Sequence, residues 1–429
     1  HNHDHHNHDN HNHDNHAHHH DEVSPIVRLF RLLTSERREI SYIYFFAILI
    51  GIVNLSMPLG LQAIISIMSG GIIFNTVVIL VIMVIAGTAL SGFLQIMQIT
   101  FVEVLQQRVF AKAAYEFSFR IPKIKMESIS KSYAPELINR FFDVLNIQKS
   151  LPKFLIDLTS ATLQIIFGVI LLSFYHSMFI FFGLLLVIII VVILYVTGPA
   201  GLASSIRESK YKYKVAHWLE ELGRNVTTFK LAGFTNLPME KTDYYLSNYL
   251  KARQKHFKIL KRQYTAIIIF KTIVTAGLLI MGGFLVVDRQ INLGQFIAAE
   301  LIIVLVISSV EKLISTLEVI YDLLTALDKV GHVTDLPIEE SKGIPLESLP
   351  NPENFRIDIK NLSYKYEDQK NYSLEGVTLT IKKGEKICVV GKNNSGKSTF
   401  MKILTGLQHE YEGSITYNKF TLRDISITS

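Results

Sequence analysis

The stretch FIFFGLLLVIIIVVILYV, residues 179–196, decides the fold because it holds no charged side chain along its whole length. A helix needs about 20 apolar residues to cross a bilayer. A helix in a soluble protein normally keeps a polar stripe toward water, and this stretch has none. It therefore predicts a membrane-spanning helix rather than a helix buried in a large soluble core.

Working outward from this stretch, we find five more of the same character. The six predicted spans lie near residues 40–64, 72–99, 154–175, 177–197, 264–287 and 293–315. The composition agrees, since only 19% of the 429 residues are charged and 49% are apolar, against about 25% charged residues in soluble domains. This excludes a wholly soluble enzyme, a disordered chain and a nucleic-acid-binding domain. One cysteine, Cys388, excludes an internal disulfide framework.

The connections between spans fall into two groups by their content of lysine and arginine. Lysine and arginine together number four in residues 21–39, nine in 102–153 and thirteen in 198–263, but none in 65–71 and 174–176 and one in 288–291. Basic loops stay in the cytoplasm, so we expect both termini and the two long loops there. The long loops read as helical extensions of the spans. Residues 119–131 and 222–232 interrupt the apolar periodicity, and we expect short transverse segments there.

Three residues within the spans stand out. Lys271 lies in the inner half of the fifth span and Glu300 near the middle of the sixth. Charges in a membrane are costly and often functional. The two either line a translocation path or form a structural pair, or the lysine extends its side chain toward the membrane surface. Pro58 predicts a kink in the first span.

The first twenty residues contain eleven histidines among Asn, Asp and one Ala. Such a tract cannot bury a core and predicts disorder. It lacks the features of a signal or transit peptide. Three interpretations stay open: an affinity tag, a natural solvated tail, or a Zn²⁺- or Ni²⁺-binding tail.

The composition changes after about Lys329. Four prolines within sixteen residues, Pro337, Pro345, Pro350 and Pro352, indicate a linker. Strand-like alternation follows in residues 355–366 and 377–381, and again in 386–390. We divide the chain into a His/Asn-rich tract (1–20), a transmembrane domain (21–330), a linker (331–353) and a second domain (354–429).

The run GKNNSGKST, residues 391–399, has the spacing of a phosphate-binding P-loop. Gly391 and Gly396 allow backbone amides to point at phosphate oxygens. Lys397 reaches the β- and γ-phosphates, and the Ser398 hydroxyl can ligate Mg²⁺. A helix is expected to open around Ser398–Thr399 and to add its dipole. A Rossmann site is excluded because the glycine spacing differs.

Two further residues belong to this neighbourhood. The apolar strand expected at Ile387–Val390 places Cys388 in a buried position, where it packs and is not a nucleophile. Tyr366 lies about 25 residues before the loop. Its ring either stacks on a nucleobase or packs as an ordinary aromatic residue of the sheet.

With these motifs, residues 23–429 resemble an ABC exporter half-transporter. The resemblance implies an all-α six-helix transmembrane domain followed by an incomplete α/β P-loop nucleotide-binding domain. It makes Tyr366 the adenine-stacking aromatic and GKNNSGKST the Walker A loop, although Asn393 and Asn394 replace the more usual Gly or Ser. The implied nucleotide-binding set is Tyr366, Gly391, Asn394, Ser395, Gly396, Lys397, Ser398 and Thr399, with Lys397 catalytic and Ser398 on the metal.

The resemblance also implies how the protein works. ATP and Mg²⁺ would be bound between two copies of the chain in the bacterial inner membrane, with the nucleotide domains in the cytoplasm. The segments 119–131 and 222–232 match the coupling helices of such exporters. Phrases such as ELINRFFDV and ESKYKYKVAHWLEEL suggest the type I secretion and toxin- or bacteriocin-exporting branch, with Bacteroidetes-like members. Those members usually work with a periplasmic adaptor and an outer-membrane channel. A peptide or protein is the expected cargo, membrane lipid surrounds the spans, and no nucleic acid is involved.

The family's glutamine loop, signature, Walker B carboxylates and switch histidine have no counterpart before Ser429. His409 and Glu412 lie too close to the P-loop for those roles. We therefore expect this chain alone to be inactive as an ATPase, and we expect no leader-cleaving peptidase domain before the first span. Two alternatives remain: an exporter of divalent metal, lipid or drug, and a nucleotide-gated regulatory membrane protein without hydrolysis.

Overall fold

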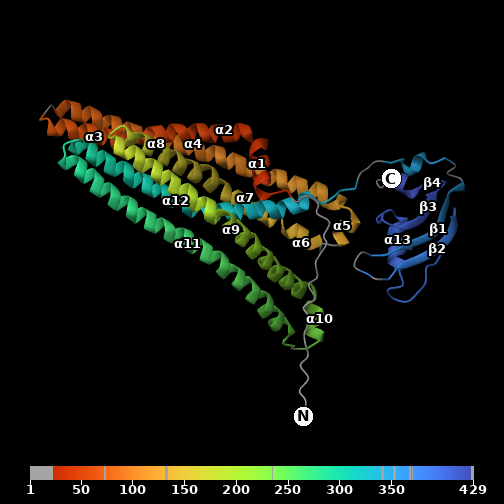
Figure 1. Cartoon of the computed structure of the whole chain (residues 1–429). Coiled ribbons are helices and arrows are strands. Elements are labelled where there is room, and N and C mark those ends of the chain that lie inside the picture. Colours follow the sequence, from red (N-terminus) through yellow and green to blue (C-terminus); the bar gives the residue numbers. More distant parts are fainter. Residues whose placement is uncertain are drawn as a thin grey trace, which may run out of the picture.

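The computed structural model describes residues 23–71, 74–130, 134–233, 235–339, 343–350, 354–366, 369 and 371–426. A long helical bundle carries a small sheet domain at one end (Figure 1). The helices are α1 (Pro25–Ser35), α2 (Arg37–Asn54), α3 (Ser56–Ser69), α4 (Phe74–Arg120), α5 (Met126–Ser130), α6 (Ala134–Asn139), α7 (Phe142–Pro152), α8 (Thr159–Ser173), α9 (Ser177–Arg224), α10 (Val226–Leu231), α11 (Leu237–Val287), α12 (Leu293–Thr334) and α13 (Lys397–Leu404). The histidine-rich tract, 1–20, lies outside the described residues.

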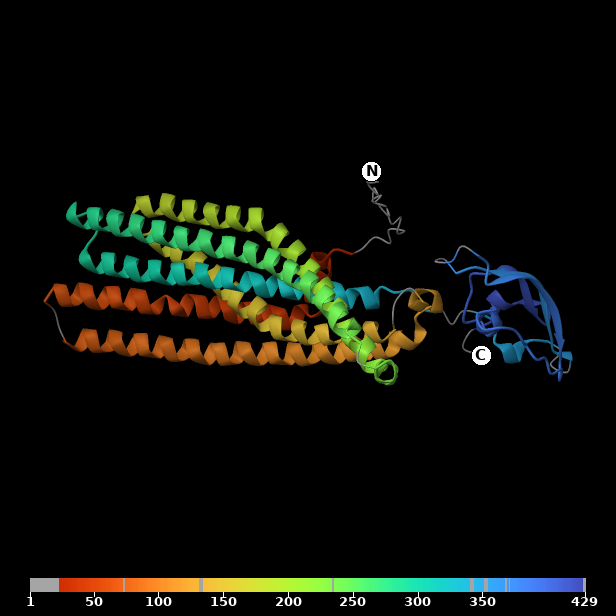
Figure 2. The ribbon, with the colours of Figure 1, turned by 90° about the horizontal axis from the view of Figure 1, so that it is seen from below.

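Six helical segments are long and apolar enough to cross a membrane, which confirms the predicted six-span domain. They are Arg37–Ser69, Asn75–Lys123, Leu137–Ser173, Ser177–Arg224, Leu237–Val287 and Leu293–Thr334. Figure 2 shows them running side by side along one direction. Helix α9 has 48 residues, about 70 Å at 1.5 Å per residue, so it extends far beyond the bilayer as a rod.

The helix ends follow from local sequence. Helix α2 ends at Asn54 because Pro58, four residues on, has no N–H to donate to the Asn54 carbonyl. The expected kink at Pro58 is therefore a break between α2 and α3. Helix α12 begins with a capping box, in which the Asn292 side chain accepts from the Gln295 amide (2.7 Å) and the Gln295 side chain accepts from the Asn292 amide (2.9 Å).

The main core of the bundle lies among α8, α9, α11 and α12. Buried apolar side chains from these helices, such as Phe179, Leu278 and Ile302, form one continuous cluster. Lys271 of α11 is paired, but with Glu311 of α12 rather than with Glu300. The pairing differs from the expectation because the two helices place Glu311, three turns further along α12, beside the lysine.

Both interruptions in the long loops fold as short helices, as predicted. A 3₁₀ turn over Ile121–Lys123 and α5 form the first, and α10 forms the second. The segment after α12 pairs with the first of these: the Lys125 amide donates to the Pro337 carbonyl (3.0 Å) and the Glu339 amide to the Lys123 carbonyl (2.6 Å). The α5 end of the bundle is thus tied to the chain that leads into the sheet domain.

The second domain contains a four-stranded antiparallel sheet in the order β2-β1-β3-β4. Its strands are β1 (Arg356–Tyr364), β2 (Leu374–Lys382), β3 (Glu412–Tyr417) and β4 (Phe420–Thr421). Ile359 of β1 lies opposite Leu379 and Ile415, and Ile403 of α13 packs on the same core. A helical bundle followed by a partial α/β nucleotide domain confirms the predicted fold class.

One predicted strand is wrong. Residues 385–390 form no strand, and Ile387, Val389 and Val390 are exposed. Cys388 is exposed as well, not buried as expected. The physical reason is that none of the described strands pairs with this segment, so its apolar side chains meet no facing layer. The prediction rested on the apolar run alone, which signals burial but does not supply a neighbour.

Candidate functional site

The P-loop residues form a tight turn that leads into α13. Gly396 is the N-cap residue, with φ +83°, and Asn394 also takes a positive φ, 65°. Left-handed backbone of this kind suits Gly and, less readily, Asn. Helix α13 itself forms because Phe400 and Ile403 are spaced to pack on the sheet core. It ends at Leu404, and Gly406, two residues further on, takes a φ of +71°.

Gly391 and Gly396 lie where even a Cβ atom would come very close to neighbouring atoms. A Cβ at Gly396 would lie 2.4 Å from the Ser373 carbonyl oxygen, and a Cβ at Gly391 would lie 2.6 Å from Ser395 Oγ. The contact at Gly396 is with backbone and admits no side chain unless the chain shifts, whereas the contact at Gly391 is with a serine hydroxyl that would have to rotate away. The first turn of α13 also carries no acidic residue, so the helix dipole and the free amides favour an anion there. The residues present therefore fit a phosphate chain.

Lys397 folds back over the loop that precedes it. Its ammonium donates to the carbonyls of Gly391 (2.8 Å) and Lys392 (2.6 Å) and lies 3.4 Å from Ser395 Oγ. A phosphate oxygen could replace these carbonyls as the acceptor of the Lys397 ammonium.

A polar cavity of about 330 Å³ lies over this turn. It brings together most of the predicted set, and its lining is Tyr366, Gln369, Ser373, Asn393, Asn394, Ser395, Gly396, Lys397, Ser398 and Thr399. Gly391 lies at the start of the loop and is outside this lining. Gln369 and Ser373 were not predicted, because the turn between β1 and β2 brings them to the loop and no local pattern marks them.

Tyr366 reaches the P-loop directly. Its hydroxyl and that of Thr399 are hydrogen-bonded at 3.1 Å. Thr399 is buried, whereas Ser398 is exposed. The Thr399 hydroxyl is therefore engaged with the tyrosine, and the Ser398 hydroxyl is the one open to a metal ion. Among the described residues that line the cavity none is Asp or Glu.

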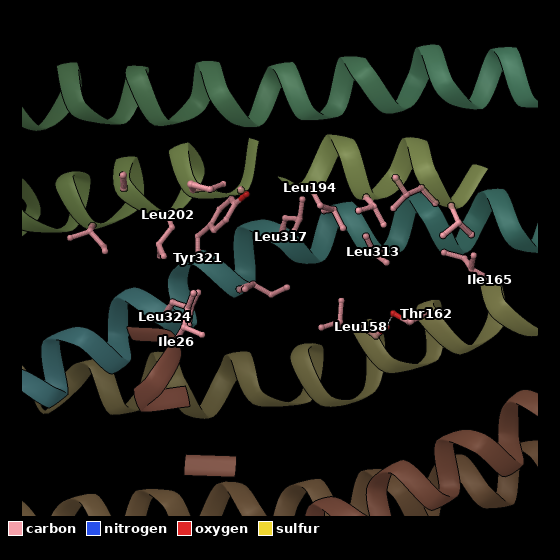
Figure 3. Close-up of a pocket in the computed structure, with 18 of the residues that line it drawn as sticks. Ile26, Leu158, Thr162, Ile165, Leu194, Leu202, Leu313, Leu317, Tyr321 and Leu324 are labelled. Carbon is pink, nitrogen blue, oxygen red and sulfur yellow. Dashed lines mark hydrogen bonds between the residues drawn. The ribbon is translucent and has the colours of Figure 1, made fainter. Parts of the chain in front are cut away.

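A second cavity lies in the bundle. It measures about 850 Å³ and is almost entirely apolar. Figure 3 shows side chains of α8, α9 and α12 converging on it, with Ile26 of α1 beside Leu324 at one end. Tyr321 brings one of the few polar atoms, and its hydroxyl already accepts a hydrogen bond from Gln263 (2.7 Å). An apolar group would fit this cavity better than a charged one.

Among the residues that the structure describes, no group of three His, Cys, Asp or Glu side chains could hold a metal ion. The histidine tract, the basis of the metal alternative, lies outside them.

Comparison with known proteins agrees with both parts of the chain. The family "ABC transporter transmembrane region" matches residues 40–310, and the family "ABC transporter" matches residues 374–429. The lacticin-481/lactococcin-DR transport/processing ATP-binding protein of Lactococcus lactis subsp. lactis is 37% identical over 122 residues, 28% of this chain and 17% of that protein.

Two other relatives have similar names. The subtilin transport ATP-binding protein of Bacillus subtilis is 27% identical over 167 residues, 38% of this chain and 25% of that protein. The alpha-hemolysin translocation ATP-binding protein of Escherichia coli O157:H7 is 32% identical over 124 residues, 29% of this chain and 17% of that protein. The matches thus span a quarter or less of these curated relatives. Since the transmembrane family covers well over half of the chain and an ATP-binding P-loop follows it, this multi-pass membrane protein belongs to the ABC transporter family.

Proposed function

We propose that the protein serves ATP-driven export of a peptide or protein across the bacterial inner membrane, as one half of a homodimeric ABC exporter. The observation that carries the proposal is the position of the P-loop: it faces Tyr366 in a polar cavity, in a domain held at one end of a six-span bundle. A conformational change caused by a triphosphate bound there could reach the bundle through the contact between the sheet domain and α5.

Each P-loop residue has a role in this proposal. The backbone of Gly391, Asn394, Ser395 and Gly396 surrounds the phosphates, and Lys397 exchanges its carbonyl contacts for phosphate oxygens. Thr399 holds Tyr366 by its hydroxyl, which leaves the tyrosine ring to stack on adenine. Ser398 is the residue that would hold Mg²⁺, which supplies charge neutralisation to the phosphates when bound.

A second copy of the chain is proposed from the two transverse helices. Helix α5 touches the sheet domain of its own chain, whereas α10 lies well apart from it (Figure 1). Leu231 of α10 is 84% exposed. A neighbouring cavity of about 380 Å³ is lined by Leu222, Val226, Phe229, Lys230, Gly233, Thr235 and Pro238. We propose that this end of the bundle contacts the nucleotide domain of the second copy.

We propose the orientation in the membrane from the distribution of Lys and Arg, and the cargo from the names of the relatives. The Lys and Arg residues in the two long loops support a cytoplasmic position for α5, α10 and the nucleotide domain. Three relatives are named for the transport or translocation of lacticin-481/lactococcin-DR, of subtilin and of alpha-hemolysin, and we propose a peptide or protein cargo for this chain as well. A periplasmic adaptor and an outer-membrane channel are proposed as further partners.

The test is nucleotide binding and transport by the protein in inverted vesicles of the bacterial cell membrane. We expect Mg²⁺-ATP to bind and Lys397→Ala to weaken binding at least about tenfold, because the substitution removes a charge-assisted contact. Because this chain alone is expected to be inactive as an ATPase, uptake of a labelled peptide is measured with a chain that carries the complete nucleotide-binding domain, and there it should require ATP. Equal binding by the variant would refute the assigned site, and an absence of uptake with the complete domain would refute export of peptides.

The 850 Å³ apolar cavity favours one other candidate, an exporter of lipid or of an apolar drug. The two candidates differ in what a bulky substitution in the cavity does. Ala203→Phe should block export of an apolar cargo, whereas a peptide carried between two copies should pass unaffected.

A further inference from the structure

Gln408 is a buried amide that reaches toward the nucleotide site. Its side chain is 4% exposed, and its Nε2 donates to the hydroxyl of Tyr364 on β1. Burying an amide is unfavourable unless it is hydrogen-bonded. This contact therefore fixes the Tyr364 hydroxyl relative to the chain that follows α13.

The Tyr364 ring supports Tyr366. The two rings meet edge to face, with centroids 4.9 Å apart and planes at 89°, a favourable geometry for aromatic pairs. Burial raises the pKa of Tyr364 to about 12, so the hydroxyl stays neutral and hydrogen-bonded at cellular pH. Tyr366 is thus held on one side by the Tyr364 ring and on the other by the Thr399 hydroxyl.

The residue after Gln408 contacts the membrane domain. The His409 amide donates to Glu127 Oε1 of α5 at 2.7 Å. The start of α5 is fixed in turn by the two backbone hydrogen bonds between residues 123–125 and 337–339. Two neighbouring residues therefore make the two contacts: the Gln408 side chain contacts the tyrosine pair, and the His409 backbone amide contacts α5.

We propose that Gln408 and Tyr364 are positioning residues that set the Tyr366 ring for the nucleobase, and that the Glu127–His409 contact links this ring position to α5. The inference rests on the proposed nucleotide site and adds the specific route by which α5 senses the base. By linkage, a base that orders Tyr366 must also order α5, and the coupling works in both directions.

The first test separates the base from the phosphates. The affinities of Mg²⁺-ATP and of Mg²⁺-tripolyphosphate are measured by calorimetry on the full chain in nanodiscs. Gln408→Met and Tyr364→Phe should each weaken ATP binding about fivefold, the effect of one neutral hydrogen bond. Tripolyphosphate binding should change less than about twofold, since it does not use the tyrosine.

The matched control is Tyr417→Phe. Tyr417 lies on the neighbouring strand β3 and its hydroxyl donates to the Leu404 carbonyl (2.6 Å), so the variant also loses one tyrosine hydrogen bond in this domain but leaves the route intact. It should bind both ligands as the unmodified protein does. A loss of tripolyphosphate binding in Gln408→Met would show general damage to the domain and overturn the positioning role.

The second test follows hydrogen exchange in residues 124–130. Mg²⁺-ATP should slow exchange there at least about threefold more than Mg²⁺-tripolyphosphate does. Glu127→Ala should abolish this difference, and Glu127→Gln, which keeps the accepting oxygen, should retain it. Equal protection by the two ligands would overturn the link to α5.

The outcomes also distinguish this inference from the proposed function. If the unmodified chain binds neither ligand, or if Lys397→Ala changes neither affinity, the nucleotide site itself is wrong and the inference falls with it. If Tyr366→Ala weakens ATP binding but Gln408→Met and Tyr364→Phe do not, the site stands and only the positioning role is lost.

Discussion

Lys271 Nζ lies 2.5 Å from Glu311 Oε1, and this ion pair joins α11 to α12 within the apolar part of the bundle. The two side chains are 45% and 44% exposed. Charges inside a membrane face the interior of a bundle or a water-filled cavity rather than hydrocarbon. We expect this face of α11 and α12 to border water and to line the path between two copies.

Removing one partner of this pair should destabilise the membrane domain. Glu311→Gln leaves the Lys271 charge without its carboxylate, and the melting temperature in nanodiscs should fall by about 2–4 °C, the shift that 1 kcal/mol produces in a large chain. The double variant Lys271→Glu/Glu311→Lys, in which the two charges are swapped, should restore the melting temperature of the unmodified protein. Glu300→Gln on the same helix is the matched control and should have little effect. A double exchange no more stable than either single change would show that the pair does not form.

The P-loop turn should tolerate no side chain at Gly396. Gly396→Ala meets two obstacles, a left-handed backbone that costs alanine about 1–2 kcal/mol and a Cβ only 2.4 Å from the Ser373 carbonyl. Gly384→Ala is a control with the first obstacle alone, since φ is +78° there but nothing lies within 4 Å.

Gly396→Ala should therefore lower the melting temperature more than Gly384→Ala and weaken ATP binding by about tenfold or more, while Gly384→Ala leaves binding intact. Calorimetric melting and titration measure both. Equal effects of the two substitutions would mean that the clash is relieved by movement of the loop.

The junction between α5 and the linker should depend on pH through Glu339. Burial, and then the negative charge of Glu127, raise the pKa of this carboxyl, against the lowering effects of His409 and Lys125. A carboxyl with a raised pKa in the folded state favours its protonated form, so its contribution to stability is lost as the pH rises through that pKa.

Glu339→Gln removes this penalty. The variant should exchange the Lys125 amide more slowly than the unmodified protein at pH 7, and the difference should shrink toward pH 4, where both carry a neutral side chain. The measurement is the hydrogen-exchange rate of the Lys125 amide in both proteins from pH 4 to pH 7, corrected for the intrinsic pH dependence of exchange. A constant ratio across this range would rule out Glu339 as the titrating group.

The spans and the P-loop could be predicted because both are written in local sequence. The uncharged run 179–196 needs no partner to be recognised, and the spacing from Gly391 to Lys397 sets a turn and a helix start by itself. The identity of the partner of Lys271 could not be predicted, because it depends on how α11 and α12 are rotated and shifted against each other.

Strands β3 and β4 and the lining residues Gln369 and Ser373 were missed for a related reason. In β3, Gly413 takes a φ of +93° and lies against the backbone of Asn361, so the strand lacks a clean alternation. Gln369 and Ser373 come to the P-loop only through the pairing of β1 with β2. Both features depend on contacts between distant parts of the chain, which no single window of sequence contains.

Residues 387–390 were expected to form a buried strand and instead form an exposed segment without strand structure. Cys388 lies in the apolar run 387–390, of which Val390 is 83% exposed. Its thiol should react with a maleimide in the folded 429-residue chain as fast as a small free thiol does, because neither strand pairing nor packing covers it. Ile415→Cys in a Cys388→Ser background is the matched control, since Ile415 is fully buried in β3, and it should react only after denaturation. Labelling of Cys388 that also required denaturant would mean that this apolar run is covered in solution, as its sequence suggested.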